Sequence, residues 1–132
     1  MPKHVGLSHV SLSVRDLDTS RDWYADVLGF APFEEPAGHG WREVVMVHPS
    51  GAVLCLQQHD GNDGEPFDPV RTGADHAAFQ VESRAELDEW QRYLAERGVR
   101  HSPVANEPYG SVLCLRDPDG FQLELFYREN HP

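Results

Sequence analysis

The chain has 132 residues, of which 39% are hydrophobic and 25% are charged, a composition typical of one folded domain rather than a disordered or membrane-embedded chain. Its 22 acidic and 11 basic residues give a formal net charge of -11, so neither a nucleic acid nor an anionic membrane is expected as a partner. No apolar run approaches the ~20 residues that span a bilayer, and the N-terminus lacks the apolar stretch of a secretory signal. We therefore expect a cytoplasmic protein.

The first half of the chain predicts a strand, a helix and three further strands. Apolar and polar residues alternate over 7–14, which is typical of a half-buried strand. A helix is expected from Asp18 to Leu28, and Gly29 ends it. Turn residues then separate three predicted strands, at 31–35, 41–48 and 52–57.

The second half predicts the same order of elements. A strand is expected over 75–81, and the capping box that begins at Ser83 opens a helix to about Arg97. Three more strands follow, at 100–105, 110–116 and 121–127.

The two halves match each other as an internal repeat. A shift of 67 residues superposes His9 on His76 and Trp23 on Trp90, and a shift of 69 superposes Leu54 on Leu123. The chain is therefore predicted to be a single α+β domain, 1–132, built from two βαβββ modules in tandem. The modules are 5–57 and 74–128, joined by a polar linker at 58–73.

Two histidines and a glutamate are expected on the sheet faces that the helices leave uncovered. His9, His76 and Glu124 each alternate with the apolar residues of their own strand. Two imidazoles and a carboxylate form a metal site that leaves positions open for water or substrate. Taken singly, each residue has a simpler interpretation, as a hydrogen-bonded core histidine or a solvated glutamate. The equivalent places of His9 and His76 in the repeat favour the metal site.

Four segments of the sequence together form a recognisable pattern. They are Leu7-Ser8-His9-Val10-Ser11-Leu12, Trp23-Tyr24-Ala25-Asp26-Val27-Leu28-Gly29-Phe30, His76-Ala77-Ala78-Phe79 and Asp117-Pro118-Asp119-Gly120-Phe121-Gln122-Leu123-Glu124-Leu125. These segments resemble the vicinal oxygen chelate superfamily, which includes glyoxalase I, fosfomycin-inactivating thiol transferases, extradiol dioxygenases, methylmalonyl-CoA epimerase and the bleomycin resistance proteins. The resemblance implies a cupped, mixed sheet around a metal, with the helices outside and a second subunit often completing the site.

The resemblance also implies a ligand set and shows where this chain departs from its relatives. It implies metal ligation by His9, His76 and Glu124, with Glu124 also catalytic. A fourth ligand of glyoxalases and epimerases falls on Cys55, which argues against those two activities and leaves open a thiolate ligand or an inert core thiol. Gln57, on the same face, is a candidate for hydrogen bonding to substrate.

Further departures concern the fosfomycin enzymes and the dioxygenases. The chain lacks the basic tail of the fosfomycin enzymes, and its net charge is negative, so a phosphonate substrate is not expected. The strand before the carboxylate lacks the tyrosine acid of the dioxygenases, although Tyr109 lies just ahead of it. Bleomycin-binding members have lost the metal ligands, whereas all three are present here.

Two functions follow from these patterns. The first is a lyase or isomerase, thiol transferase or dioxygenase in which one divalent metal (Mn, Fe, Ni or Zn) chelates two oxygens of a small molecule and stabilises an anionic intermediate. The second is a metal-independent protein that sequesters an antibiotic. The resemblance implies a homodimer with the site near the subunit interface, with swapped or unswapped modules. Candidate substrate contacts are Ser11, Cys55, Gln57, Tyr109 and Phe126.

Overall fold

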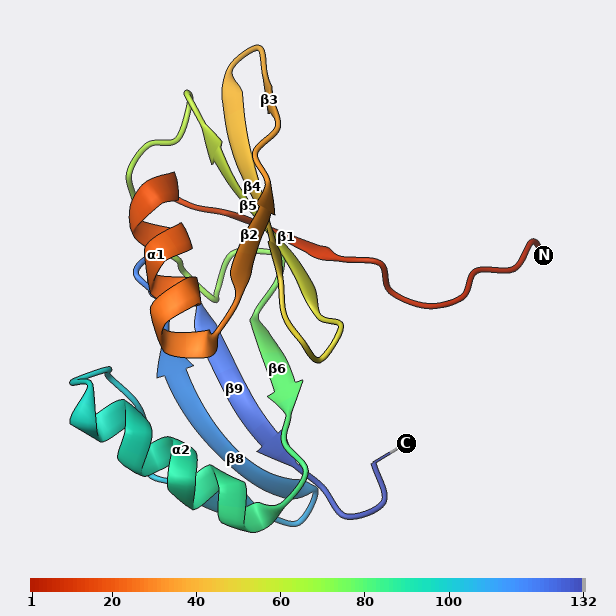
Figure 1. The fold of residues 1–132 in the computed structure, drawn as a ribbon, viewed down its shortest axis with the longest axis vertical. Coiled ribbons are helices and arrows are strands. Elements are labelled where there is room, and N and C mark those ends of the chain that lie inside the picture. Colours follow the sequence, from red (N-terminus) through yellow and green to blue (C-terminus); the bar gives the residue numbers. More distant parts are fainter. Residues whose placement is uncertain (132) are drawn as a thin grey trace. The chain divides into compact units, whose positions relative to one another are not determined.

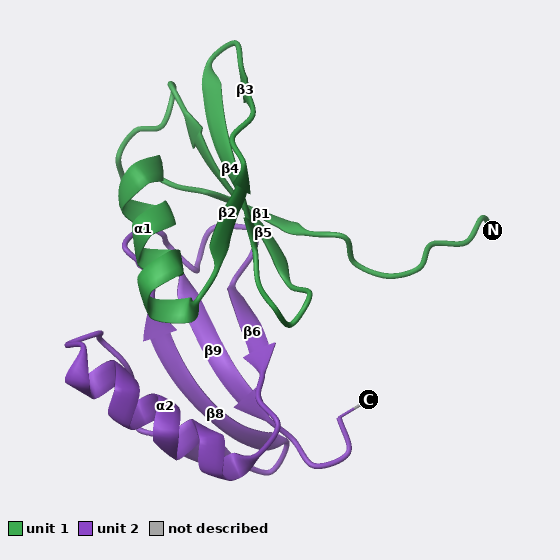
Figure 2. Ribbon diagram, in the orientation of Figure 1, with its two compact units in different colours: residues 1–66 green, residues 67–132 purple. Residues whose placement is uncertain are grey.

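The computed structural model describes residues 1–131, which fall into two compact units, Met1–Pro66 and a second that begins at Phe67 (Figure 2). Each unit contains one helix and one mixed sheet. The strand order in the first sheet is β1 (Val10–Ser13), β5 (Val53–His59), β4 (Trp41–Val47) and β2 (Ala31–Glu34), and β3 (Ala37–Gly38) also pairs with β4. The order in the second sheet is β6 (His76–Gln80), β9 (Gln122–Tyr127), β8 (Gly110–Arg116) and β7 (Ala105–Glu107). The predicted α+β class is confirmed. Over residues 1–131, no helix has the length and apolar character that crossing a membrane requires.

The first unit follows the predicted order with shifted boundaries (Figure 1). The first strand begins after His9, not at residue 7, and the residues before it extend away from the sheet. The short strand β3 (Ala37–Gly38), which was not predicted, pairs antiparallel with β4. The elements are β1 (Val10–Ser13), α1 (Leu17–Leu28), β2 (Ala31–Glu34), β3 (Ala37–Gly38), β4 (Trp41–Val47) and β5 (Val53–His59).

Helix α1 begins one residue before the predicted start because Asp16 caps it. The Asp16 carboxylate accepts a hydrogen bond from the backbone N–H of Thr19 at 2.7 Å, which also lowers the pKa of the carboxyl. Gly29 ends the helix in the left-handed conformation, with φ 73°. The helix packs against β4 and β5. Buried side chains on the helix side of the sheet form the core of this unit: Leu12, Val14, Val44, Met46, Leu54 and Leu56.

The second unit repeats this plan. Its helix packs against β8 and β9, and the side chains between them are fully buried: Leu87, Leu94, Leu113, Leu115 and Leu123. The predicted cap at Ser83 is confirmed, because its hydroxyl accepts from the N–H of Glu86 at 3.3 Å. The elements are β6 (His76–Gln80), α2 (Arg84–Glu96), β7 (Ala105–Glu107), β8 (Gly110–Arg116) and β9 (Gln122–Tyr127).

The strand predicted over 100–105 is wrong in its extent. His101 forms an isolated bridge to Leu115, and the regular strand β7 starts only at Ala105. Pro103 has no N–H to donate, and the Ser102 hydroxyl accepts from the N–H of Cys114 at 3.0 Å in place of a backbone carbonyl. These two features interrupt the ladder between 102 and 105.

Strand register bears out the internal repeat. In the first sheet Ser11 of β1 pairs with Cys55 of β5, and in the second Ala78 of β6 pairs with Glu124 of β9. Both pairs are parallel. Ser11 and Ala78 are related by the shift of 67 residues, and Cys55 and Glu124 by the shift of 69. Cys55 and Glu124 therefore occupy equivalent places in their sheets.

Candidate functional site

His76 and Glu124 come together on the sheet face of the second unit that lies opposite α2. The Nε2 atom of His76 is 3.8 Å from the Oε2 atom of Glu124. This follows from the register, since His76 pairs with Gln122 in the neighbouring parallel strand, and Glu124 lies two residues further along the same face. The alternation predicted for this strand is confirmed, because Leu123 and Leu125 are buried on the opposite face.

Asp75 orients the His76 imidazole. The Nδ1 atom of His76 lies 2.6 Å from the Asp75 carboxylate, to which it donates a hydrogen bond. This bond is the main reason that the pKa of His76 is raised; desolvation opposes the rise, and the charge of Glu124 adds to it. A carboxylate on one ring nitrogen fixes the tautomer and leaves the other nitrogen free to coordinate.

Gln122 orients the Glu124 carboxylate in turn. The Gln122 amide donates to Oε1 of Glu124 at 2.8 Å, and the Cys114 thiol lies 3.8 Å from the same oxygen. The remaining oxygen faces His76, and the Glu124 side chain is 17% exposed. An imidazole and a carboxylate, each held by its own hydrogen-bond partner, are a donor set that fits two ligands of a divalent metal.

His9 belongs to the first unit and is exposed immediately before β1. Its Nδ1 atom lies 3.2 Å from the Ser8 hydroxyl. Within residues 1–131, no cluster of three or more His, Cys, Asp and Glu side chains is arranged to hold a metal ion. The structure thus brings two of the three predicted ligands together, and metal ligation by His9, His76 and Glu124 stays a prediction.

The candidate contacts of the first unit lie on one face of its sheet. Ser11 and Val45 flank Cys55 on the neighbouring strands, and Gln57 lies two residues further along the strand. Cys55 is 6% exposed, and burial, aided by the negative charge of Glu43, raises the pKa of its thiol. A protonated, buried thiol favours the inert interpretation of Cys55 over the thiolate ligand.

Tyr109 and Phe126 form a stacked aromatic pair in the second unit. Their ring centroids are 6.4 Å apart, with an interplanar angle of 15°. Tyr109 is 58% exposed, and Phe126 lies two residues beyond Glu124 on the same face of β9. An aromatic surface therefore adjoins the His76–Glu124 pair.

Asp75 and Gln122 were not identified as site residues from the sequence. Gln122 alternates with the buried residues of β9, so the period-two pattern places it beside Glu124. Asp75 was included in the predicted strand 75–81, where alternation would place it on the face opposite His76. The strand begins only at His76, so Asp75 lies outside this alternation.

Residues 6–125 match the Glyoxalase/Bleomycin resistance protein/Dioxygenase superfamily. The chain belongs to this superfamily. A glyoxylase/bleomycin resistance protein/dioxygenase domain from Frankia sp. EAN1pec is similar in sequence and structure, with 38% identity, a TM-score of 0.88 and coverage of 98% of this chain and 96% of that one. Glyoxylase I 4 of Arabidopsis thaliana is 28% identical and is matched over 94% of this chain and 72% of its own length.

The superfamily also includes fosfomycin resistance proteins. FosX of Listeria monocytogenes, solved in complex with Mn(II) and sulfate, has 21% identity and a TM-score of 0.69, with coverage of 97% of this chain and 96% of that one. At this identity the likeness establishes the shared fold alone.

Proposed function

We propose that this protein is a metalloenzyme of the superfamily that acts on a small molecule bearing two neighbouring oxygens. The observation that carries the proposal is the 3.8 Å approach of the His76 imidazole to the Glu124 carboxylate, with each group held by a polar neighbour. A divalent ion bound there would supply Lewis-acid stabilisation of the negative charge that develops on substrate oxygens.

The protein's own residues prepare this site. Because Asp75 accepts the proton of Nδ1, Nε2 of His76 is free to serve as a ligand. Because Gln122 holds one oxygen of Glu124, the other is directed toward the same point. His9 is the proposed third ligand, which leaves positions for two substrate oxygens.

The donor set limits the metal but does not select one. Imidazole and carboxylate suit Mn, Fe, Ni and Zn, and the Mn(II) complex of FosX supports a divalent ion in a protein of this fold. The reaction classes consistent with such a site are isomerisation or lyase chemistry, thiol transfer and oxygenation.

The surroundings of His9 support a homodimer. Residues 1–9 are exposed, and Val5 and Leu7 are apolar side chains at 109% and 83% exposure. Exposed apolar side chains on an extended segment favour burial against a second chain. We propose that dimerisation buries this segment and with it His9.

A bidentate oxygen ligand tests the proposed function directly. Acetohydroxamate, which chelates through two oxygens, is titrated by calorimetry into the protein with and without one equivalent of Mn(II). Binding that requires the metal and is lost in Glu124→Gln supports the enzyme. Binding that is unchanged by the metal or by the substitution overturns it.

The stacked pair of Tyr109 and Phe126 favours a second function, the sequestering of a planar antibiotic without a metal. This function predicts that a planar aromatic ligand binds the metal-free protein and that Tyr109→Ala weakens its binding. His9→Ala would leave that binding intact. Under the metalloenzyme proposal the same substitution weakens metal retention.

A further inference from the structure

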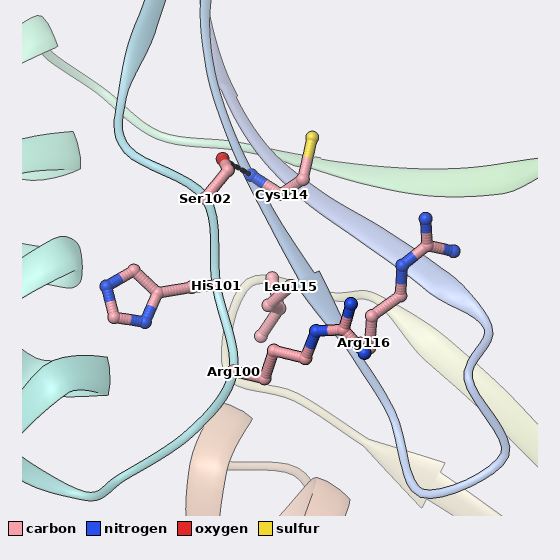
Figure 3. A pocket seen from close by; sticks show the side chains of 6 residues that line it. All are labelled: Arg100, His101, Ser102, Cys114, Leu115 and Arg116. Atoms are coloured by element: carbon pink, nitrogen blue, oxygen red, sulfur yellow. Dashed lines mark hydrogen bonds between the residues drawn. The ribbon is translucent and has the colours of Figure 1, made fainter.

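A pocket of about 250 Å³ lies at the edge of the second sheet, between the segment that follows α2 and strand β8. Arg100, from the segment that follows α2, and Arg116, from the end of β8, both line this pocket (Figure 3). Figure 3 shows the Arg100 side chain extending toward β8, whereas the His101 ring points the other way. The lining residues are Arg100, His101, Ser102, Cys114, Leu115 and Arg116.

Backbone pairing places the two arginines opposite each other. The antiparallel bridge joins His101 to Leu115, so the residue before His101 faces the residue after Leu115. The N–H of Ser102 donates to the carbonyl of Cys114 at 2.8 Å and holds this register. Like charges directly opposite on neighbouring strands destabilise a sheet unless an anion lies between them.

No carboxylate among residues 1–131 forms an ion pair with Arg100 or Arg116. Arg116 donates to the carbonyl of Gly120 at 3.1 Å. The chain has twice as many acidic as basic residues, and other arginines do form ion pairs with aspartates, among them Arg21, Arg42, Arg71 and Arg84.

Two carboxylates close to the pocket in the chain or in the sheet register accept hydrogen bonds from other groups. Glu124 accepts from Gln122, and Asp117 accepts from the backbone N–H groups of Asp119 and Phe121. Within residues 1–131, neither arginine of the pocket forms an ion pair with a carboxylate.

The strand register also shows how far the Arg116 charge lies from the proposed metal ligands. Arg116 pairs with Gln122 on β9, and Gln122 pairs with His76 on β6, so all three lie in one row on one sheet face. With neighbouring strands about 4.8 Å apart, Arg116 and His76 are roughly 10 Å apart along that row.

We propose that Arg100 and Arg116 together bind an oxyanionic group, a carboxylate or a phosphoryl group, of the small substrate. Two guanidinium groups facing one oxyanion provide several charge-assisted hydrogen bonds of fixed geometry. The inference rests on the proposed function for its link to catalysis, and it narrows the substrate class to small acids. The net charge of -11 disfavours polyanions and was the ground for not expecting a phosphonate substrate. Two arginines facing each other nevertheless provide a local positive charge for a single anionic group.

Arginine NMR signals of the metal-free protein test this site apart from any metal. Inorganic phosphate and acetate are titrated in turn at constant ionic strength set with chloride, and the Nε–Hε signals of arginine are followed. We expect saturable shifts at Arg100 and Arg116, and at least about tenfold weaker binding in Arg100→Gln and Arg116→Gln. The tighter of the two anions identifies the group as phosphoryl or carboxylate.

The control is Arg92→Gln, which removes an exposed positive charge of α2 outside the pocket and is expected to leave binding unchanged. The proposal would be overturned if the NMR shifts increased linearly with anion concentration and did not saturate. It would also be overturned if they saturated equally well in Arg100→Gln and Arg116→Gln. Since no metal is present, a failure of metal binding elsewhere does not alter the result.

Discussion

Gln122 donates a hydrogen bond to Glu124 at 2.8 Å along the same strand, and the Glu124 oxygen that this bond leaves free faces His76 at 3.8 Å. The Gln122 amide thus determines which oxygen of Glu124 faces His76. Gln122 is also the residue that pairs with His76 across the sheet. A single neutral side chain therefore links the two proposed metal ligands.

Replacing Gln122 by Leu removes this restraint at similar volume. We expect the affinity for Mn(II) to fall by about tenfold or more, because partners of metal ligands typically contribute that much. Calorimetric titration of the metal measures the change. The matched control is Gln80→Leu. Gln80 is an exposed residue of β6 on the same sheet face as Gln122, and this variant is expected to bind Mn(II) as tightly as the unaltered protein does. Equal affinities in both variants would contradict a positioning role for Gln122.

The Asp75→Asn substitution is expected to lower the pKa of His76. The hydrogen bond to Asp75 is the largest cause that raises this pKa, so the imidazolium form persists to higher pH in the unaltered protein. A proton on His76 competes with a metal, so apparent metal affinity declines as the pH falls through the raised pKa. In Asp75→Asn this decline shifts to lower pH. Histidine NMR titration of the metal-free protein gives the pKa, and an unshifted His76 signal would refute the assignment.

Gly110→Ala is expected to destabilise the protein by about 1–3 kcal/mol. A Cβ atom at Gly110 would lie 2.6 Å from the Phe126 ring and 2.6 Å from the Tyr127 carbonyl, and φ there is 150°. Gly61→Ala is the control, because no atom lies within 4 Å of its Cβ position. Urea unfolding compares the two free energies. A Gly110→Ala variant as stable as Gly61→Ala would show that the backbone next to the Tyr109–Phe126 pair is not constrained.

Cys55 is expected to react slowly with Ellman's reagent at neutral pH. Burial raises the pKa of its thiol, so little thiolate is present and access is limited. The Cys114→Ser variant isolates Cys55, and urea should restore the rate of a free thiol. Rapid reaction in the folded state would instead favour an activated or ligating thiolate.

Local patterns account for the parts of the fold that were predicted from sequence. Alternation identified the buried face of Leu123 and Leu125, and Gly29 and Ser83 marked helix ends, because these signals act within a few residues. The placement of Arg100 opposite Arg116 could not be predicted, because it depends on one isolated bridge between His101 and Leu115, and Pro103 interrupts the strand pattern that follows. The same holds for Asp75, whose direction is set outside the strand.

Whether His76 and Glu124 hold a divalent metal is tested most directly by the metal content of the purified, tag-free protein after incubation with Mn, Fe(II), Ni and Zn in turn. We expect about one metal per chain for at least one of these ions. We also expect loss of that metal in Glu124→Gln and in His76→Ala, and retention in the exposed Glu89→Gln control on α2. A chain that binds none of the four, or binds equally well without Glu124, would contradict the proposed metal site.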